Sequence, residues 1–153
     1  MLVTTEIQPL RLTHLAPVTE MLIKQLQEHH VEIAGSAISS ALEGVISDPS
    51  RGFCLVALRN GKCIGAAYVS YIWALEHGGH SAWLEELYVL PENRGGIGTL
   101  LLEAVLKKCQ EERCAALDLE IDADHERVRT LYQRNGFKSL PRRRLVKLLD
   151  VRK

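Results

Sequence analysis

Residues 84–99 read LEELYVLPENRGGIGT. The apolar run at the start of this stretch predicts a buried strand, and Pro91 ends it. Gly95, Gly96 and Gly98 then precede an amphipathic segment that predicts a helix to about Arg113. Glycines at such a junction let the backbone approach a ligand closely, and the first N–H groups of the helix point at that ligand. The glycines alone leave two interpretations open: a phosphate or pyrophosphate site, and a tight corner without a ligand.

Working outward, the hydrophobic period predicts strands and helices along the whole chain. The predicted strands cover residues 3–12, 53–58, 63–74, 82–90, 115–121 and 140–151. The other predicted helices cover residues 13–30, 36–47 and 124–134. Asn60-Gly61 predicts a hairpin turn, whereas the unit 82–121 predicts two parallel strands joined by a helix. The expected fold is a single α/β (α+β) domain over residues 1–153. It has a mixed, mostly antiparallel sheet and helices on both faces.

The composition of the chain excludes several classes of function. The chain has 153 residues, with 19 Lys+Arg against 19 Asp+Glu. A net charge of zero argues against a nucleic-acid or membrane-surface binder. No apolar run reaches the length of a membrane span, and the N-terminus lacks signal-peptide features, so the expected location is cytoplasmic. The four cysteines form no C-x-x-C pair, and neither a disulfide framework nor a metal site is expected.

Two motifs give the sequence a family resemblance. Residues 84–99 resemble the acetyl-CoA motif of the GNAT acetyltransferase superfamily, whose pattern is Val-x-Pro-x-x-Arg-Gly-x-Gly-x-Gly. Residues 125–137 read HERVRTLYQRNGF and look like the second motif of that family, Asn-x-x-Ala-x-x-Leu-Tyr followed by Gly-Phe. The glycine loop here is one residue shorter than the pattern. His125 and Val128 stand where the family usually has Asn and Ala.

The resemblance implies an enzyme that transfers an acetyl group directly from acetyl-CoA to a primary amine. The pantetheine arm would lie between the two parallel strands, which splay apart around acetyl-CoA, and the glycine turn would bind the pyrophosphate. The cofactor-binding residues implied are Leu87, Tyr88, Val89, Arg94, Gly95, Gly96, Ile97, Gly98, Thr99 and His125. A non-catalytic acyl-CoA-binding regulatory module on the same fold is the alternative.

The resemblance also implies two catalytic residues. Glu85 is expected to act as the base that takes a proton from the amine, because strand alternation places it on one face with Leu87 and Val89. Its alternative role is to bind a cationic acceptor. Tyr132 occupies the tyrosine position of the second motif and is expected to act as the general acid for the leaving thiolate. Its alternative is a core tyrosine.

The sequence determines the binding partners least well. Asp118, Glu120, Asp122 and Asp124 alternate with apolar residues. They form either a solvated face ending in a helix cap or an acidic wall that attracts a cationic acceptor. His29 and His30 end a predicted helix and are interpreted as solvated side chains. The sequence leaves a homodimer open.

Overall fold

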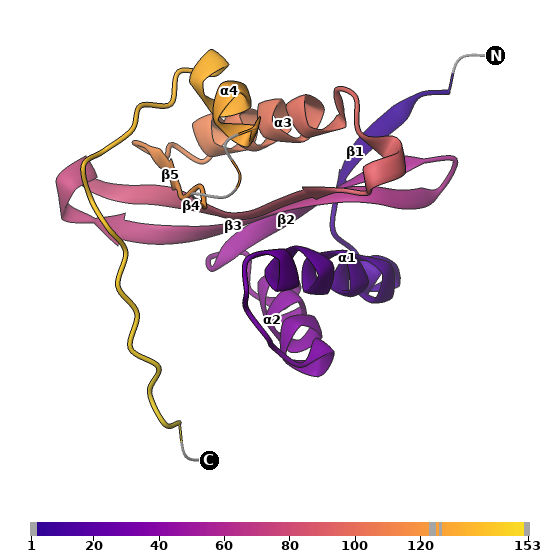
Figure 1. Ribbon diagram of the computed structural model, residues 1–153, viewed down its shortest axis with the longest axis horizontal. Coiled ribbons are helices and arrows are strands. Elements are labelled where there is room, and N and C mark those ends of the chain that lie inside the picture. The colour runs from indigo at the N-terminus through magenta and orange to yellow at the C-terminus, as the bar shows by residue number, and fades with distance from the viewer. Residues whose placement is uncertain (1–2, 123–124, 126, 152–153) are drawn as a thin grey trace.

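The computed structural model describes residues 3–122, 125 and 127–151, and it has a central sheet between two helical layers (Figure 1). The five strands lie in the order β1-β2-β3-β4-β5. They are β1 (Thr5–Pro9), β2 (Gly52–Arg59), β3 (Lys62–Ala74), β4 (Gly79–Val89) and β5 (Leu117–Leu119). All neighbouring pairs are antiparallel except β4 and β5, which run parallel. The predicted mixed, mostly antiparallel sheet is confirmed.

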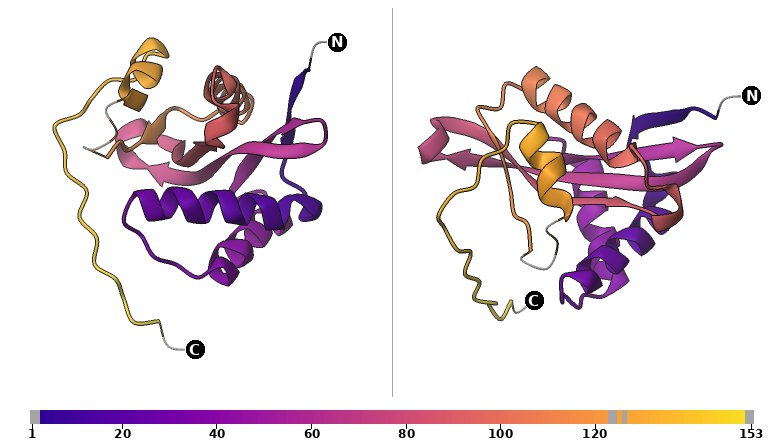
Figure 2. Two further views of the ribbon diagram at one scale, coloured as in Figure 1. Left: turned by 45° about the vertical axis from the view of Figure 1, so that its right-hand side comes forward. Right: turned by 45° about the horizontal axis from the view of Figure 1, so that its top comes forward.

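Helices cover both faces of the sheet, as predicted (Figures 1 and 2). One layer contains α1 (Leu15–Glu28) and α2 (Gly35–Ser47), and the other contains α3 (Ile97–Glu111) and α4 (Arg127–Arg134). Helices α1, α2 and α3 each pack an apolar stripe against the sheet. This explains why two separate core clusters form, one on each face of the sheet. No helix in the described part of the chain is long and apolar enough to cross a membrane.

The parallel strands β4 and β5 pair over a short distance and then separate. Their three pairs join Ala82, Trp83 and Leu84 to the three residues of β5. Past Leu84, β4 stays paired with β3 as far as Val89 but has no described partner on the β5 side. Alternate backbone N–H and C=O groups of a strand point away from its paired neighbour. Those of the second half of β4 therefore face an open edge.

The separation begins at a β-bulge in β4. Tyr68 of β3 pairs with Glu86, and the next residue, Val69, pairs with Leu84, which leaves Glu85 without a partner. A bulge bends its strand and increases the local twist. Because the bulge lies directly after the last pair with β5, it accounts for the divergence of the two strands.

The bulge also overturns the alternation predicted for Glu85. Leu84, Leu87 and Val89 all pack in the core cluster beneath α3, although Leu84 and Leu87 are three residues apart. The prediction that Glu85 lies on the same face of the sheet as Leu87 and Val89 is therefore wrong. The extra residue shifts the alternation by one, so Leu84 and Leu87 share a face and Glu85 is the unpaired residue between Leu84 and Glu86.

The strand predicted for residues 140–151 does not form. This segment pairs with no described strand, and it runs past the β5 edge of the sheet toward the layer of α1 and α2 (Figure 1). Leu145 and Leu148 are 92% and 87% exposed. A strand needs a neighbour that supplies ladder hydrogen bonds, and the three residues of β5 offer too short an edge. Two exposed ion pairs instead hold the segment, Arg142 to Glu76 and Arg144 to Glu120.

Candidate active site

The N-terminus of α3 is open and has no side-chain cap among the described residues. Gly95 and Gly96 have φ of 124° and 98°, and Gly96 is the left-handed residue from which the helix starts. A Cβ built on either glycine would meet no atom within 4 Å. Ile97 is buried and anchors the first turn. The first N–H groups of a helix have no intrahelical partner, so this open, uncapped turn fits a phosphate-bearing ligand.

The other residues predicted for the glycine turn lie around this opening. A Cβ on Gly98 would lie 3.9 Å from Cδ2 of Leu131, so the first turn of α3 is beside α4. Thr99 is half-buried. Arg94 folds back on the end of β4, where its Nε donates a hydrogen bond to the carbonyl of Val89 at 3.2 Å. Its guanidinium lies 5.7 Å from the centre of the Tyr88 ring. Arg94 is thus directed at the strand rather than at the glycines.

The residues predicted to contact pantetheine present their backbone rather than their side chains. Leu87 and Val89 pack into the core beneath α3. Tyr88 packs into the core on the opposite face, where burial raises its pKa. Only main-chain groups of these three residues remain for a ligand along the open edge.

Glu86 is the carboxyl group that the structure places in an unusual environment. It is half-buried, and burial raises its pKa to about 7. The neighbouring His29 opposes this rise, whereas the carboxylates of Glu85 and Asp122 add to it. Glu85, the residue predicted as the base, is exposed. Its charge contributes to the raised pKa of Tyr68, for which burial is the larger cause.

Tyr132 is held in place by the end of α4. Gly136, with φ of 86°, ends the helix, and the N–H of Phe137 donates to the carbonyl of Tyr132 at 3.1 Å. The two aromatic rings meet edge to face at 5.5 Å. Tyr132 is 8% exposed, and burial, with a further contribution from Glu86, raises its pKa to about 12. The structure therefore brings Tyr132 into electrostatic reach of Glu86.

The predicted line of acids is divided into separate pairs. Asp118 accepts a hydrogen bond from Nε2 of His77 at 2.9 Å, and Glu120 accepts one from Arg144 at 2.7 Å. Asp122 is hydrogen-bonded to His29, and Asp124 lies outside the described residues. Three of the four carboxylates thus have basic partners, which reduces the negative field expected from an unpaired acidic wall.

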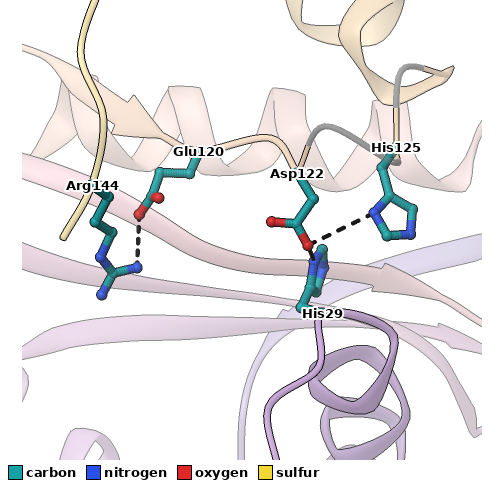
Figure 3. Close-up of polar contacts among 5 residues, drawn as sticks. All are labelled: His29, Glu120, Asp122, His125 and Arg144. Carbon is teal, nitrogen blue, oxygen red and sulfur yellow. Dashed lines mark hydrogen bonds and ion pairs between the residues drawn. The ribbon is translucent and has the colours of Figure 1, made fainter. Parts of the chain in front are cut away.

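His125, predicted as a cofactor contact, instead lies with Asp122 and His29 (Figure 3). The sequence predicts a solvated helix end at His29 and not a site residue. No sequence spacing predicts a contact between residues 93 positions apart. The presence of Asp122 in the acidic line was the one available signal.

Comparison with known proteins places the chain in a family. The family model described as "Acetyltransferase (GNAT) family" matches residues 19–137. The chain belongs to this family of acetyltransferases. The mycothiol acetyltransferase of Paenarthrobacter aurescens (strain TC1) is 35% identical over 120 residues, which are 71% of this chain and 35% of that protein. The chain thus spans about a third of the length of this curated relative.

Solved structures share the fold. A possible acetyltransferase from Clostridium difficile 630 matches with a TM-score of 0.81 at 17% identity, over 95% of this chain and 99% of that one. The aminoglycoside N-acetyltransferase AAC(6')-Iy, solved in complex with CoA, matches with a TM-score of 0.78 at 20% identity, over 97% of each chain. At these identities the likeness establishes the architecture.

Proposed function

We propose that this chain is an acyl-CoA-dependent N-acyltransferase that moves an acetyl group from acetyl-CoA directly to a primary amine. One observation carries the proposal. The start of α3 has no side-chain cap among the described residues and follows the end of β4, where β4 and β5 have separated, and the charge of Glu86 on β4 contributes to the raised pKa of Tyr132 on α4. Membership of the acetyltransferase family supports the reaction class. The CoA complex of the aminoglycoside N-acetyltransferase supports the choice of CoA.

The proposed binding mode uses main-chain groups. The first N–H groups of α3 carry the positive end of the helix dipole and would hold the pyrophosphate. The open edge of β4 from Leu87 to Val89 would pair with the amides of pantetheine as an added strand does. Open space at Gly95 and Gly96 leaves room for the phosphate oxygens.

Acetyl-CoA supplies a thioester whose carbonyl carbon accepts the amine nitrogen while the sulfur departs as a thiolate. An alkyl amine has a pKa of about 10.4, so at neutral pH it must lose a proton before it can attack. Glu86 is the residue placed to take that proton, because a pKa of about 7 keeps it substantially ionised at neutral pH and still basic. We assign the base to Glu86 in place of the exposed Glu85.

Tyr132 would stabilise the departing sulfur. A pKa of about 12 keeps its phenol protonated at neutral pH. An alkyl thiol has a pKa of about 8.5, so complete transfer of the phenolic proton to a thiolate is unfavourable, whereas a hydrogen bond to the developing negative charge is favourable. We therefore assign Tyr132 a hydrogen-bond donor role, and solvent completes the protonation of the thiol.

The acceptor proposed is a cationic amine. Glu85 is exposed and adjoins Glu86, so two carboxylates occur at the bulge where β4 leaves β5. The positive charge of an amine would be attracted to this pair as it approaches. The paired acids Asp118 and Glu120 contribute less, because His77 and Arg144 already offset their charge.

Two measurements on the purified chain test this function. Acetyl-CoA at a hundredfold excess over its Kd is expected to stabilise the fold by about 2.7 kcal/mol, which raises Tm on the order of 5–10 °C. Thiol release from acetyl-CoA is then followed across polyamines, peptides and aminoglycosides. The absence of any thermal shift would overturn the CoA assignment. A thermal shift without amine-dependent thiol release would indicate the non-catalytic acyl-CoA-binding module.

A further inference from the structure

Two histidines and an aspartate from distant parts of the chain lie together beside the candidate active site. His29 follows the last residue of α1, Asp122 follows β5, and His125 lies just before α4. Figure 3 shows both imidazole rings turned toward the carboxylate of Asp122. The cluster therefore joins the layer of α1 and α2 to the layer of α3 and α4 at the end of the sheet where β4 and β5 separate.

The ligand atoms of these side chains are close together. One nitrogen from each histidine and one oxygen of Asp122 all lie within 4.8 Å of one another. Nδ1 of His29 is hydrogen-bonded to Oδ2 of Asp122, and Nδ1 of His125 lies 3.8 Å from the same oxygen. The two rings are tilted by 57° with centroids 5.0 Å apart, so they do not stack. The three groups converge on one small volume.

One atom of the cluster is left unsatisfied by the protein. Nδ1 of His125 is buried and has no hydrogen-bond partner among the described residues. A buried polar atom without a partner costs free energy, and such atoms in native proteins commonly contact water or an ion. The side chains of His29, Asp122 and His125 are 28%, 44% and 32% exposed, so the cluster lies close to the surface although this nitrogen is buried.

We propose that His29, Asp122 and His125 bind one divalent transition-metal ion of the zinc type. Two imidazole nitrogens and one carboxylate oxygen are the ligands that Zn²⁺ and its first-row neighbours prefer, whereas Mg²⁺ and Ca²⁺ prefer oxygen alone. Ligand–metal distances of about 2.0–2.2 Å require small side-chain movements: His29 and Asp122 exchange their hydrogen bond for the ion and move apart, and His125 moves closer. Three protein ligands leave at least one coordination position for water.

The bound ion would link α1 to the segment before α4. Because Asp122 follows β5 closely, the ion would lie at the end of the sheet where β5 has left β4. Its binding does not depend on the proposed acyl transfer, because the ligand atoms all come from this cluster. The metal can therefore be tested without any measurement of activity.

The test is a titration of the tag-free, chelator-washed chain with ZnCl₂ by calorimetry and with CoCl₂ by visible absorption. The wild type is expected to bind one ion per chain, with the Co²⁺ absorption bands of a nitrogen- and oxygen-liganded site. His29→Gln and His125→Gln each remove one ligand and are expected to weaken binding by at least about tenfold. Asp122→Asn is the third variant, and circular dichroism of each variant checks its fold.

His30→Asn is the matched control, since it removes a neighbouring histidine outside the cluster at a left-handed position that Asn tolerates. It is expected to bind the ion as the wild type does. The proposal is overturned if the wild type binds no Zn²⁺ or Co²⁺ in the titration. It is equally overturned if the folded His29, Asp122 and His125 variants all bind with unchanged affinity, because the ion then has other ligands.

Discussion

At the scale of single residues, Glu86 is the side chain whose replacement has the clearest expected outcome. Its pKa of about 7 means that the base is ionised above neutral pH and protonated below it, so the rate of the wild type should fall as pH drops through 7. Glu86→Gln should lower kcat at neutral pH by about 10²-fold. The loss should be partly recovered at high pH, where solvent has already deprotonated the amine. The pH profiles of kcat, recorded with EDTA present, check this.

Glu85→Gln is the matched control for that prediction. It removes an equal charge from the adjacent position, but Glu85 is exposed and lies at the bulge. We expect a modest rise in KM for a cationic acceptor and an unchanged pH profile of kcat. If instead Glu85→Gln abolishes turnover and Glu86→Gln does not, the base is the residue that the family resemblance first indicated.

Tyr132→Phe should lower kcat while leaving the affinity for acetyl-CoA unchanged. The phenol would interact with negative charge that develops only as the thiolate leaves, so its removal raises the barrier without weakening the ground state. The expected loss for one hydrogen-bond donor to a developing charge is about 10²-fold. The edge-to-face contact with Phe137 is retained in the variant, which keeps α4 in place. Saturating kinetics and a direct measurement of Kd separate the two effects, and equal kcat values would make Tyr132 a packing residue.

Single-residue roles were the part of the site that the sequence predicted least well. Tyr132 follows from a motif, and its predicted role in catalysis stays a prediction. The choice between Glu85 and Glu86 depends on a register shift of one residue. The shift is visible in the structure, where Leu84 and Leu87 share one core cluster although they are three residues apart, an odd spacing for one face of a regular strand. The contact of His29 with Asp122 depends on tertiary packing, and no pattern of neighbouring residues in the sequence predicts it.

At the scale of elements, the N-terminus of α3 can be tested by the charge of one side chain. Gly98→Asp places a carboxylate in the first turn, where it repels a pyrophosphate and also complements the helix dipole. Binding of acetyl-CoA should therefore weaken while the free energy of unfolding of the unliganded chain stays equal or rises. Calorimetric titration and thermal unfolding of the same sample measure the two quantities.

Gly98→Ala separates charge from bulk in that experiment. A Cβ at this position would meet Leu131 at an ordinary contact distance of 3.9 Å, so Ala fits without displacement. The Ala variant should bind acetyl-CoA much more tightly than the Asp variant does. Equal loss in both would mean that space, not charge, limits binding, and wild-type affinity in both would place the pyrophosphate elsewhere.

Most elements were predictable because their hydrophobic period is local. The strands around the Asn60-Gly61 turn and the crossover through α3 appear as predicted. The prediction of a strand over residues 140–151 was wrong, because an alternating pattern contains no information about a partner strand. The neighbouring strand β5 is only three residues long. Strand formation depends on neighbours in a way that helix formation does not.

At the scale of the whole molecule, the segment 140–151 should be dispensable for the fold. Its leucines are exposed, and its ion pairs to Glu76 and Glu120 lie at the surface, where such pairs contribute little. Deletion of these residues should change Tm by less than about 2 °C and should reduce self-association at high concentration. Thermal unfolding and light scattering measure both, and a large fall in Tm would show that the segment packs on the domain.

The bulge at Glu85 has a consequence for how such a site could arise. Without Glu85, the order Leu84-Glu86-Leu87-Tyr88-Val89 would alternate between the two faces of the sheet with no interruption. A regular strand of this kind has the lower twist that lets a parallel neighbour continue its ladder. The insertion of one codon, that of Glu85, would then be enough to separate β4 from β5. Gain or loss of that codon would open or close the edge while leaving every core side chain in place.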